Sequence, residues 1–147
     1  LDVHKDKIVA CILTVPLGKP TNSEIREFTT LIPDMAALRD WIVSQNCHHV
    51  AMESTGIYWM PIYEILEAAF AGDITLLVVN ARHMKNVPGK KTDMRDSEWI
   101  STLLRAGLLN GSFIPEKRIR EFRDLNRYRK SVIRDITSQK NRVEKFL

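Results

Sequence analysis

Two carboxylates lie three residues apart in the segment Lys91-Thr92-Asp93-Met94-Arg95-Asp96, at the start of a predicted helix. Positions i and i+3 are neighbours on one helix face, with Cβ atoms roughly 5–6 Å apart. Two carboxylates about 4 Å apart repel each other by up to about 4 kcal/mol at an effective dielectric constant of 20. A helix N-terminus offsets only ~0.3–1 kcal/mol per charge. A divalent cation would stabilise this pair far more, so the spacing raises the question of whether other acids complete a metal site.

Two further acids stand on predicted strands. Asp2 lies in the strand expected at residues 1–4, where apolar and polar residues alternate. Glu53 ends the strand expected at residues 50–53, and Asp93 and Asp96 follow the strand at residues 74–79 across a loop. If the sheet places these three strands side by side, all four carboxylates can converge, because ligands bind at the strand-end loops of such sheets.

The elements that must position these acids follow a regular order. Residues 1–4, 8–15 and 24–30 are expected to form an antiparallel three-stranded meander, whose second strand is apolar enough to be covered on both faces. Helices are expected at residues 33–45, 57–70 and 93–106, with strands at 50–53 and 74–79 between them. Three antiparallel strands followed by alternating helices and strands predict a mixed α/β sheet flanked by helices.

A four-carboxylate site is suited to Mg²⁺, which prefers carboxylate and water oxygens and works together with substrate phosphates. Four such ligands around two ions roughly 3.5–4 Å apart would support in-line displacement at phosphorus. Each acid also has an ordinary structural explanation: Asp2 as an exposed strand residue, Glu53 as an acid at a helix entrance, Asp93 as an N-cap and Asp96 as a first-turn acid. The residues alone leave both interpretations open.

Positive charge gathers in two places. Residues 115–147 carry eleven Lys and Arg against five Asp and Glu, whereas residues 1–114 carry eleven against thirteen. A basic C-terminal segment indicates an acidic partner such as nucleic acid, although a solvated helix face would have the same composition. The loop before the acid pair could likewise hold a nucleic-acid backbone or simply be solvated. The candidate residues are Arg82, His83, Lys85, Lys90 and Lys91 of this loop, together with Arg95 between the two acids.

The last helix is expected to run from residue 116 to the end of the chain. Eight of its residues follow the alternating three- and four-residue spacing of a coiled coil, and six of the eight are apolar. They are Phe122, Leu125, Arg129, Val132, Ile136, Gln139, Val143 and Phe146. An amphipathic helix packed on its own domain would show the same spacing.

Two cysteines are too few for a disulfide framework, and they predict reduced thiols in a cytoplasmic protein. Cys47, His48 and His49 are adjacent, but no second ligand cluster lies at zinc spacing. No apolar run approaches a membrane span, so no membrane partner is expected. The chain starts inside a strand pattern and stops inside a helical one, so we expect a fragment that lacks a residue or two of its first strand and whatever follows residue 147.

Three motifs together resemble the insertion-sequence one-ten family of transposases, the DEDD class related to Piv-type DNA invertases. They are Leu1-Asp2-Val3-His4-Lys5-Asp6, Met52-Glu53-Ser54-Thr55-Gly56-Ile57-Tyr58-Trp59 and Lys91-Thr92-Asp93-Met94-Arg95-Asp96. Further similar stretches lie at residues 79–83, 107–115 and 125–130, so the resemblance spans essentially the whole chain in order. Ser97 departs from the alanine that many relatives have after the last aspartate.

The resemblance implies a RuvC-like domain of the ribonuclease H fold at residues 1–114, with a five-stranded mixed sheet. A basic helix entering a coiled coil would follow at residues 115–147. The family's acidic tetrad would fall on Asp2, Glu53, Asp93 and Asp96, as catalytic residues that bind Mg²⁺, with Mn²⁺ as a possible substitute. The family's serine-bearing C-terminal domain is absent from this sequence, so the chain alone is not expected to complete recombination.

The expected partners are DNA, a structured guide RNA from the element, and further copies of the chain, as a dimer or tetramer through the long helix. The function implied is a DNA transposase or recombinase that cleaves and exchanges strands. Two alternatives remain: a Holliday-junction-resolving or other two-metal nuclease on the same fold, and a non-catalytic module for nucleic-acid binding and oligomerisation.

Overall fold

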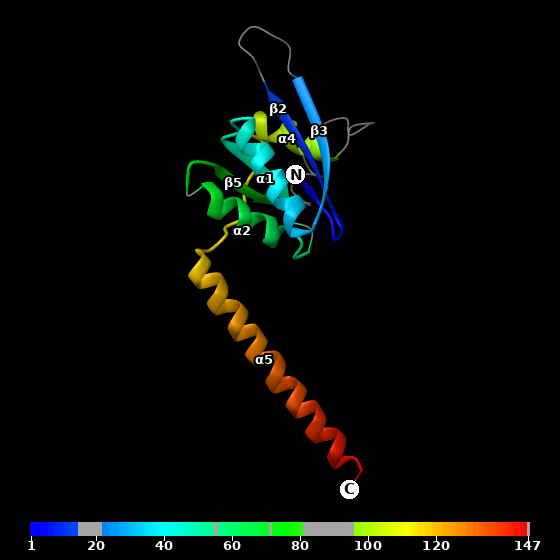
Figure 1. The fold of residues 1–147 in the computed structure, drawn as a ribbon. Helices are drawn as coiled ribbons and strands as arrows, with labels where there is room; N and C mark the ends of the chain where they lie inside the picture. The colour runs from blue at the N-terminus through cyan, green and yellow to red at the C-terminus, as the bar shows by residue number, and fades with distance from the viewer. Residues whose placement is uncertain (15–21, 55, 71, 81–95, 147) are drawn as a thin grey trace. The chain divides into compact units, whose positions relative to one another are not determined.

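The computed structural model describes residues 1–14, 22–54, 56–70, 72–80 and 96–146 (Figure 1). The chain forms two compact units, Leu1–Ser112 and Phe113–Leu147. The predicted division into residues 1–114 and 115–147 as functional domains stays a prediction.

The first three strands form the predicted antiparallel meander, in the order β1-β2-β3. Strand β1 (Asp2–Val3) pairs with β2 (Lys7–Thr14), and β2 pairs along its whole length with β3 (Asn22–Thr29). Residues 8–12 of β2 are all buried, which confirms the prediction that this strand is covered on both faces. Strand β1 is shorter than the four residues predicted for it.

The remaining strands form a separate parallel pair, β4 (His49–Glu53) and β5 (Thr75–Val79). The described residues thus contain a three-stranded and a two-stranded sheet, where we predicted one sheet of five strands. Leu1 connects the two. Its backbone nitrogen donates to the Ala51 carbonyl at 2.6 Å, and the Glu53 nitrogen donates to the Leu1 carbonyl at 3.2 Å.

Three helices accompany these strands: α1 (Ile32–Ser44), α2 (Trp59–Phe70) and α4 (Asp96–Arg105). The predicted apolar stripe of α1 is confirmed, because Met35, Leu38, Trp41 and Ile42 are its buried residues. Helix α2 begins two residues later than predicted. The residues predicted to open α4, Asp93 to Arg95, lie outside the described part of the chain.

The helices divide between the two faces of the strands. On one face, Phe28 of β3 packs against Trp41 of α1, with ring centroids 5.8 Å apart. On the other face, Ser101 of α4 donates a hydrogen bond to the Cys11 sulfur of β2 at 3.3 Å. Since Phe28 pairs with Ile8, and residues 8 and 11 of one strand point to opposite faces, α1 and α4 cover opposite sides. Figure 1 shows α1 and α2 on one side of the strands and α4 on the other.

Helix α4 has a defined C-terminal end. Gly107 adopts a left-handed conformation with φ of 68°, its nitrogen donates to the Leu104 carbonyl, and the Leu108 nitrogen donates to the Leu103 carbonyl. This pair of bonds is the Schellman arrangement that satisfies the last carbonyls of a helix. It confirms the prediction that Gly107 ends this helix.

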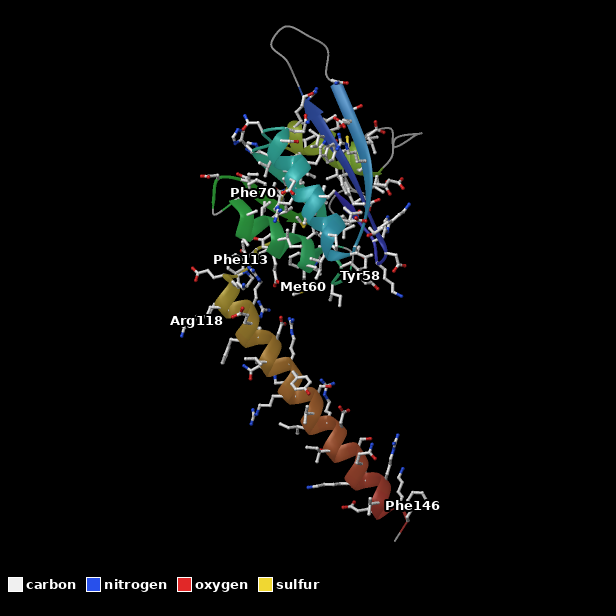
Figure 2. All side chains as sticks on the ribbon, viewed as in Figure 1. Tyr58, Met60, Phe70, Phe113, Arg118 and Phe146 are labelled. Atoms are coloured by element: carbon white, nitrogen blue, oxygen red, sulfur yellow. The ribbon has the colours of Figure 1, made fainter. Side chains whose placement is uncertain are left out.

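The second unit contains helix α5 (Lys117–Glu144), from which side chains project on every side (Figure 2). All six apolar residues at the predicted coiled-coil positions are exposed: Phe122, Leu125, Val132, Ile136, Val143 and, just beyond the helix, Phe146. Among the described residues, no helix combines the length and the apolar character that crossing a membrane requires.

Candidate metal centre

Asp2 and Glu53 lie opposite each other on neighbouring strands. In a parallel ladder, a residue that donates to position j−1 and accepts from position j+1 stands opposite position j. Leu1 donates to Ala51 and accepts from Glu53, so it stands opposite Met52, and Asp2 follows opposite Glu53. Neighbouring strands are ~4.8 Å apart, and in-register side chains point to the same face. The two carboxylates therefore share one face of the sheet.

That face is the one covered by α4. Asp2 pairs with Val9, which lies on the same side of β2 as Cys11, the residue that contacts Ser101 of α4. Glu53 lies on the same side of β4 as Ala51, because the two residues are two positions apart on one strand. Ala51 packs in one cluster with Val79 of β5 and with Ile100 and Leu103 of α4.

The direction of α4 brings its first turn toward the two acids. A cavity of about 750 Å³ at the far end of the strands is lined by Leu104 and Arg105 from the end of α4, and by His48 and His49 from the start of β4. The end of α4 thus lies near the start of β4, so the helix runs antiparallel to this strand. Its N-terminal residue, Asp96, therefore lies toward the end of β4 that carries Glu53.

The first turn of α4 is held against the sheet by Ser97, which is completely buried. Ser97 precedes Ser101 by one helical turn, about 5.4 Å, and Val9 precedes Cys11 by two strand residues, about 6.6 Å. The contact between Ser101 and Cys11 therefore brings Ser97 toward the row of the sheet that contains Val9 and Asp2. The Ser97 hydroxyl has no hydrogen-bond partner among the described residues.

The carboxylate of Asp2 is largely shielded from solvent. Its side chain is 11% exposed, and its Oδ2 accepts a hydrogen bond from His4 Nε2 at 3.1 Å. His4 itself is half exposed. A desolvated carboxylate requires hydrogen-bonding or cationic partners, and the His4 ring supplies one of them.

The predicted tetrad stays a prediction. Asp2 and Glu53 are adjacent, and Asp96 begins α4 at the same end of the strands. Within the described ranges, no group of three or more His, Cys, Asp and Glu side chains is close enough to hold a metal ion. Asp93 lies outside these ranges, as do all the predicted basic-loop residues: Arg82, His83, Lys85, Lys90, Lys91 and Arg95.

The cysteines are both free, as predicted. Burial raises the pKa of the Cys11 thiol above its ordinary 9.0, and the nearby Glu98 acts in the same direction, while the Ser101 hydrogen bond lowers it. Burial also raises the pKa of Cys47. Cys47, His48 and His49 all line the cavity at the opposite end of the strands.

Two residues of this region were not identified as functional candidates from the sequence. The alternation of residues 1–4 did place His4 on the same face as Asp2, which was the available signal. For Ser97, the sequence showed only that it replaces the alanine of many relatives. Its complete burial could not be predicted without knowing which face of α4 meets the sheet.

One comparison with known proteins identifies the family of the chain. The family model DEDD_Tnp_IS110, described as Transposase, matches residues 1–147. No curated protein matches the chain. Because the family match covers every residue, the chain belongs to the DEDD transposase family of insertion sequences.

Proposed function

We propose that residues 1–114 form a RuvC-like domain of the ribonuclease H fold, in which all five strands form one sheet in the order β3-β2-β1-β4-β5. The support is the pair of backbone hydrogen bonds through Leu1, which have the spacing of a parallel ladder between β1 and β4. The separate ladders β1-β2-β3 and β4-β5 would then be the two halves of this sheet.

The proposed function is Mg²⁺-dependent cleavage and exchange of DNA strands by an insertion-sequence transposase, through the carboxylates of Asp2, Glu53, Asp93 and Asp96. The observation that carries it is the in-register placement of Asp2 and Glu53 on the sheet face that α4 covers. Placing the largely buried Asp2 carboxylate beside the partly exposed Glu53 carboxylate is unfavourable unless a cation compensates for their charge. The oxygen donors of these side chains fit Mg²⁺ or Mn²⁺.

Each residue has a defined part in this proposal. Asp2 and Glu53 would hold the ion from the strands, Asp96 would approach from the start of α4, and Asp93 would complete the ligand set. Bound Mg²⁺ would supply a Lewis acid at the scissile phosphate and would activate the attacking oxygen. Placing two ligands on strands fixes their positions more precisely than placing all four on loops.

The proposed partners are DNA, a structured guide RNA and other copies of the chain. The basic loop from Arg82 to Lys91, together with Arg95, would hold the nucleic-acid backbone beside the acids. Helix α5 would join a coiled coil in a dimer or tetramer, which the exposure of Leu125, Val132 and Ile136 supports.

Thermal melting in Mg²⁺ and Mn²⁺ tests the metal site. Ligand binding to the folded state raises its stability by ~2.7 kcal/mol at a concentration 100 times Kd. We expect millimolar metal to raise the melting temperature of the wild-type chain but not that of Asp93→Ala. An equal response of the two proteins would count heavily against the site.

Strand cleavage by the full-length protein separates this function from its alternatives. Loss of cleavage in each of the four single acid variants supports the transposase. Cleavage of branched DNA by the 147-residue chain alone would instead support a junction-resolving nuclease. Full activity of Asp2→Ala and Glu53→Ala would identify a non-catalytic module.

A further inference from the structure

The contact between His4 and Asp2 suggests a role that goes beyond the four acids. His4 and Asp2 flank Val3, which is completely buried, so the pleat of β1 directs both of their side chains to the face opposite Val3. This is the face covered by α4, on which Glu53 also lies. His4 is therefore on the same side as the proposed metal site.

The backbone of His4 is fixed by the turn that joins β1 to β2. The His4 nitrogen donates to the Lys7 carbonyl at 2.9 Å, and Val3 pairs with Ile8 directly beside this turn. The imidazole therefore projects from a hydrogen-bonded position next to Asp2, which favours a reproducible contact.

The contact uses only one of the two carboxylate oxygens. His4 Nε2 lies 3.1 Å from Asp2 Oδ2, and since a carboxylate only accepts, the imidazole N–H is the donor. A donor fixed on Oδ2 restricts rotation of the carboxylate and favours binding of a cation through Oδ1. Hydrogen-bond partners of this kind orient the ligands of metal sites, and their loss typically lowers metal affinity about 10–100-fold.

We propose that His4 is a positioning residue that holds the Asp2 carboxylate in the orientation required for metal binding. This inference rests on the proposed function, because it requires Asp2 to be a metal ligand. His4 acts through its hydrogen bond and does not itself bind the ion. The Asp2 side chain is 11% exposed and that of His4 is 49% exposed, so His4 can be replaced without opening the core.

The experiment measures the affinity of the 147-residue chain for Mn²⁺ by electron paramagnetic resonance of the free ion. We expect His4→Ala to weaken binding about 10–100-fold. His4→Gln, which keeps an N–H donor of similar reach, should bind within about 3-fold of wild type. His48→Ala is the matched control, because His48 is an exposed histidine at the opposite end of the strands, and it should bind as wild type does.

Melting temperatures in EDTA separate positioning from a merely structural role. A structural role would lower the melting temperature of His4→Ala without changing the Mn²⁺ affinity of the folded protein, and that result would overturn the proposal. Electron–nuclear resonance adds a second criterion. A nitrogen coupling to bound Mn²⁺ that disappears in His4→Ala would make His4 a ligand and would also overturn it.

Failure of this inference is distinguishable from failure of the proposed function. If Asp2→Ala abolishes Mn²⁺ binding while His4→Ala binds as wild type does, only the role of His4 is wrong. If wild type, Asp2→Ala and Asp93→Ala all respond to Mn²⁺ in the same way, the metal site itself is wrong, and the role of His4 is overturned with it.

Discussion

Replacing Glu53 with glutamine should make the metal-free chain more stable. Glu53 stands opposite Asp2 on the neighbouring strand, and both side chains project toward α4. Without a cation, these two carboxylates repel each other in the folded state and are separated in the unfolded chain. Glutamine keeps the size of the side chain and leaves the His4–Asp2 hydrogen bond untouched, so this variant removes mainly the repulsion.

The size of the effect follows from the strand spacing. Side chains that project in register from strands ~4.8 Å apart can bring their carboxylates to about 5.5 Å. At this distance the Coulomb energy is about 3 kcal/mol at a dielectric constant of 20 and about 0.8 kcal/mol in water. Asp2 is largely buried and Glu53 is partly exposed, so we expect ~1–2 kcal/mol at low salt. For a chain of this size, that raises the melting temperature by about 3–10 °C.

The assay is thermal melting of wild type and Glu53→Gln, in EDTA and in Mg²⁺. The variant should melt at a higher temperature than wild type in EDTA and should lose most of the stabilisation that Mg²⁺ gives the wild type. Glu27→Gln is the control. Glu27 pairs with Val9 in the same row of the sheet, but it is exposed and lies two strands from Asp2, about 10 Å, where the Coulomb energy in water is only about 0.4 kcal/mol.

A specific result would refute this reasoning. If Glu53→Gln melts at or below the wild-type temperature in EDTA, the two carboxylates do not repel each other, and the register derived from the Leu1 hydrogen bonds does not bring them together. A rise of equal size in Glu27→Gln would show that general net charge, rather than the pair, is responsible.

Three further predictions concern the remaining elements. Ile100→Ala removes a side chain that is 1% exposed and packs on Ala51 and Val79, so urea denaturation should show a loss of about 2–5 kcal/mol. Burial raises the pKa values of Cys11 and Cys47, so these thiols ionise at lower pH in the unfolded chain, and stability should fall as the pH rises through about 9 and above. The urea midpoint should therefore be lower at pH 9.5 than at pH 7.5, and this decrease should be absent from the double variant Cys11→Ala/Cys47→Ala. Val132→Asp/Ile136→Asp places charges on the exposed apolar face of α5 and should dissociate an α5-mediated oligomer in sedimentation velocity, whereas Ser138→Asp should leave it intact.

The sequence predicted the elements of this fold better than their arrangement. The alternation in residues 1–4 has the period of a strand, and the stripe on α1 has the period of a helix. The continuous apolar run of β2 is typical of a strand that is covered on both faces. The predicted single sheet of five strands is not confirmed, because the described residues form a three-stranded and a two-stranded sheet. Pairing between β1 and β4 depends on contacts between residues about fifty positions apart, which no local pattern in the sequence encodes.

For the candidate site, too, the sequence predicted the residues better than their arrangement. The types and spacing of Asp2, Glu53 and Asp96 could be found in the sequence, but their meeting at one end of the strands depends on the direction in which α4 crosses the sheet. That direction is set by packing, through Ile100 and Leu103 on Ala51 and Val79, and by the contact of Ser101 with Cys11. A helix of the same composition that crossed in the reverse direction would carry Asp96 to the end where His48 and His49 lie. The apolar face of α4 therefore contributes to the proposed site as directly as Asp96 does, because it determines which end of the strands Asp96 reaches.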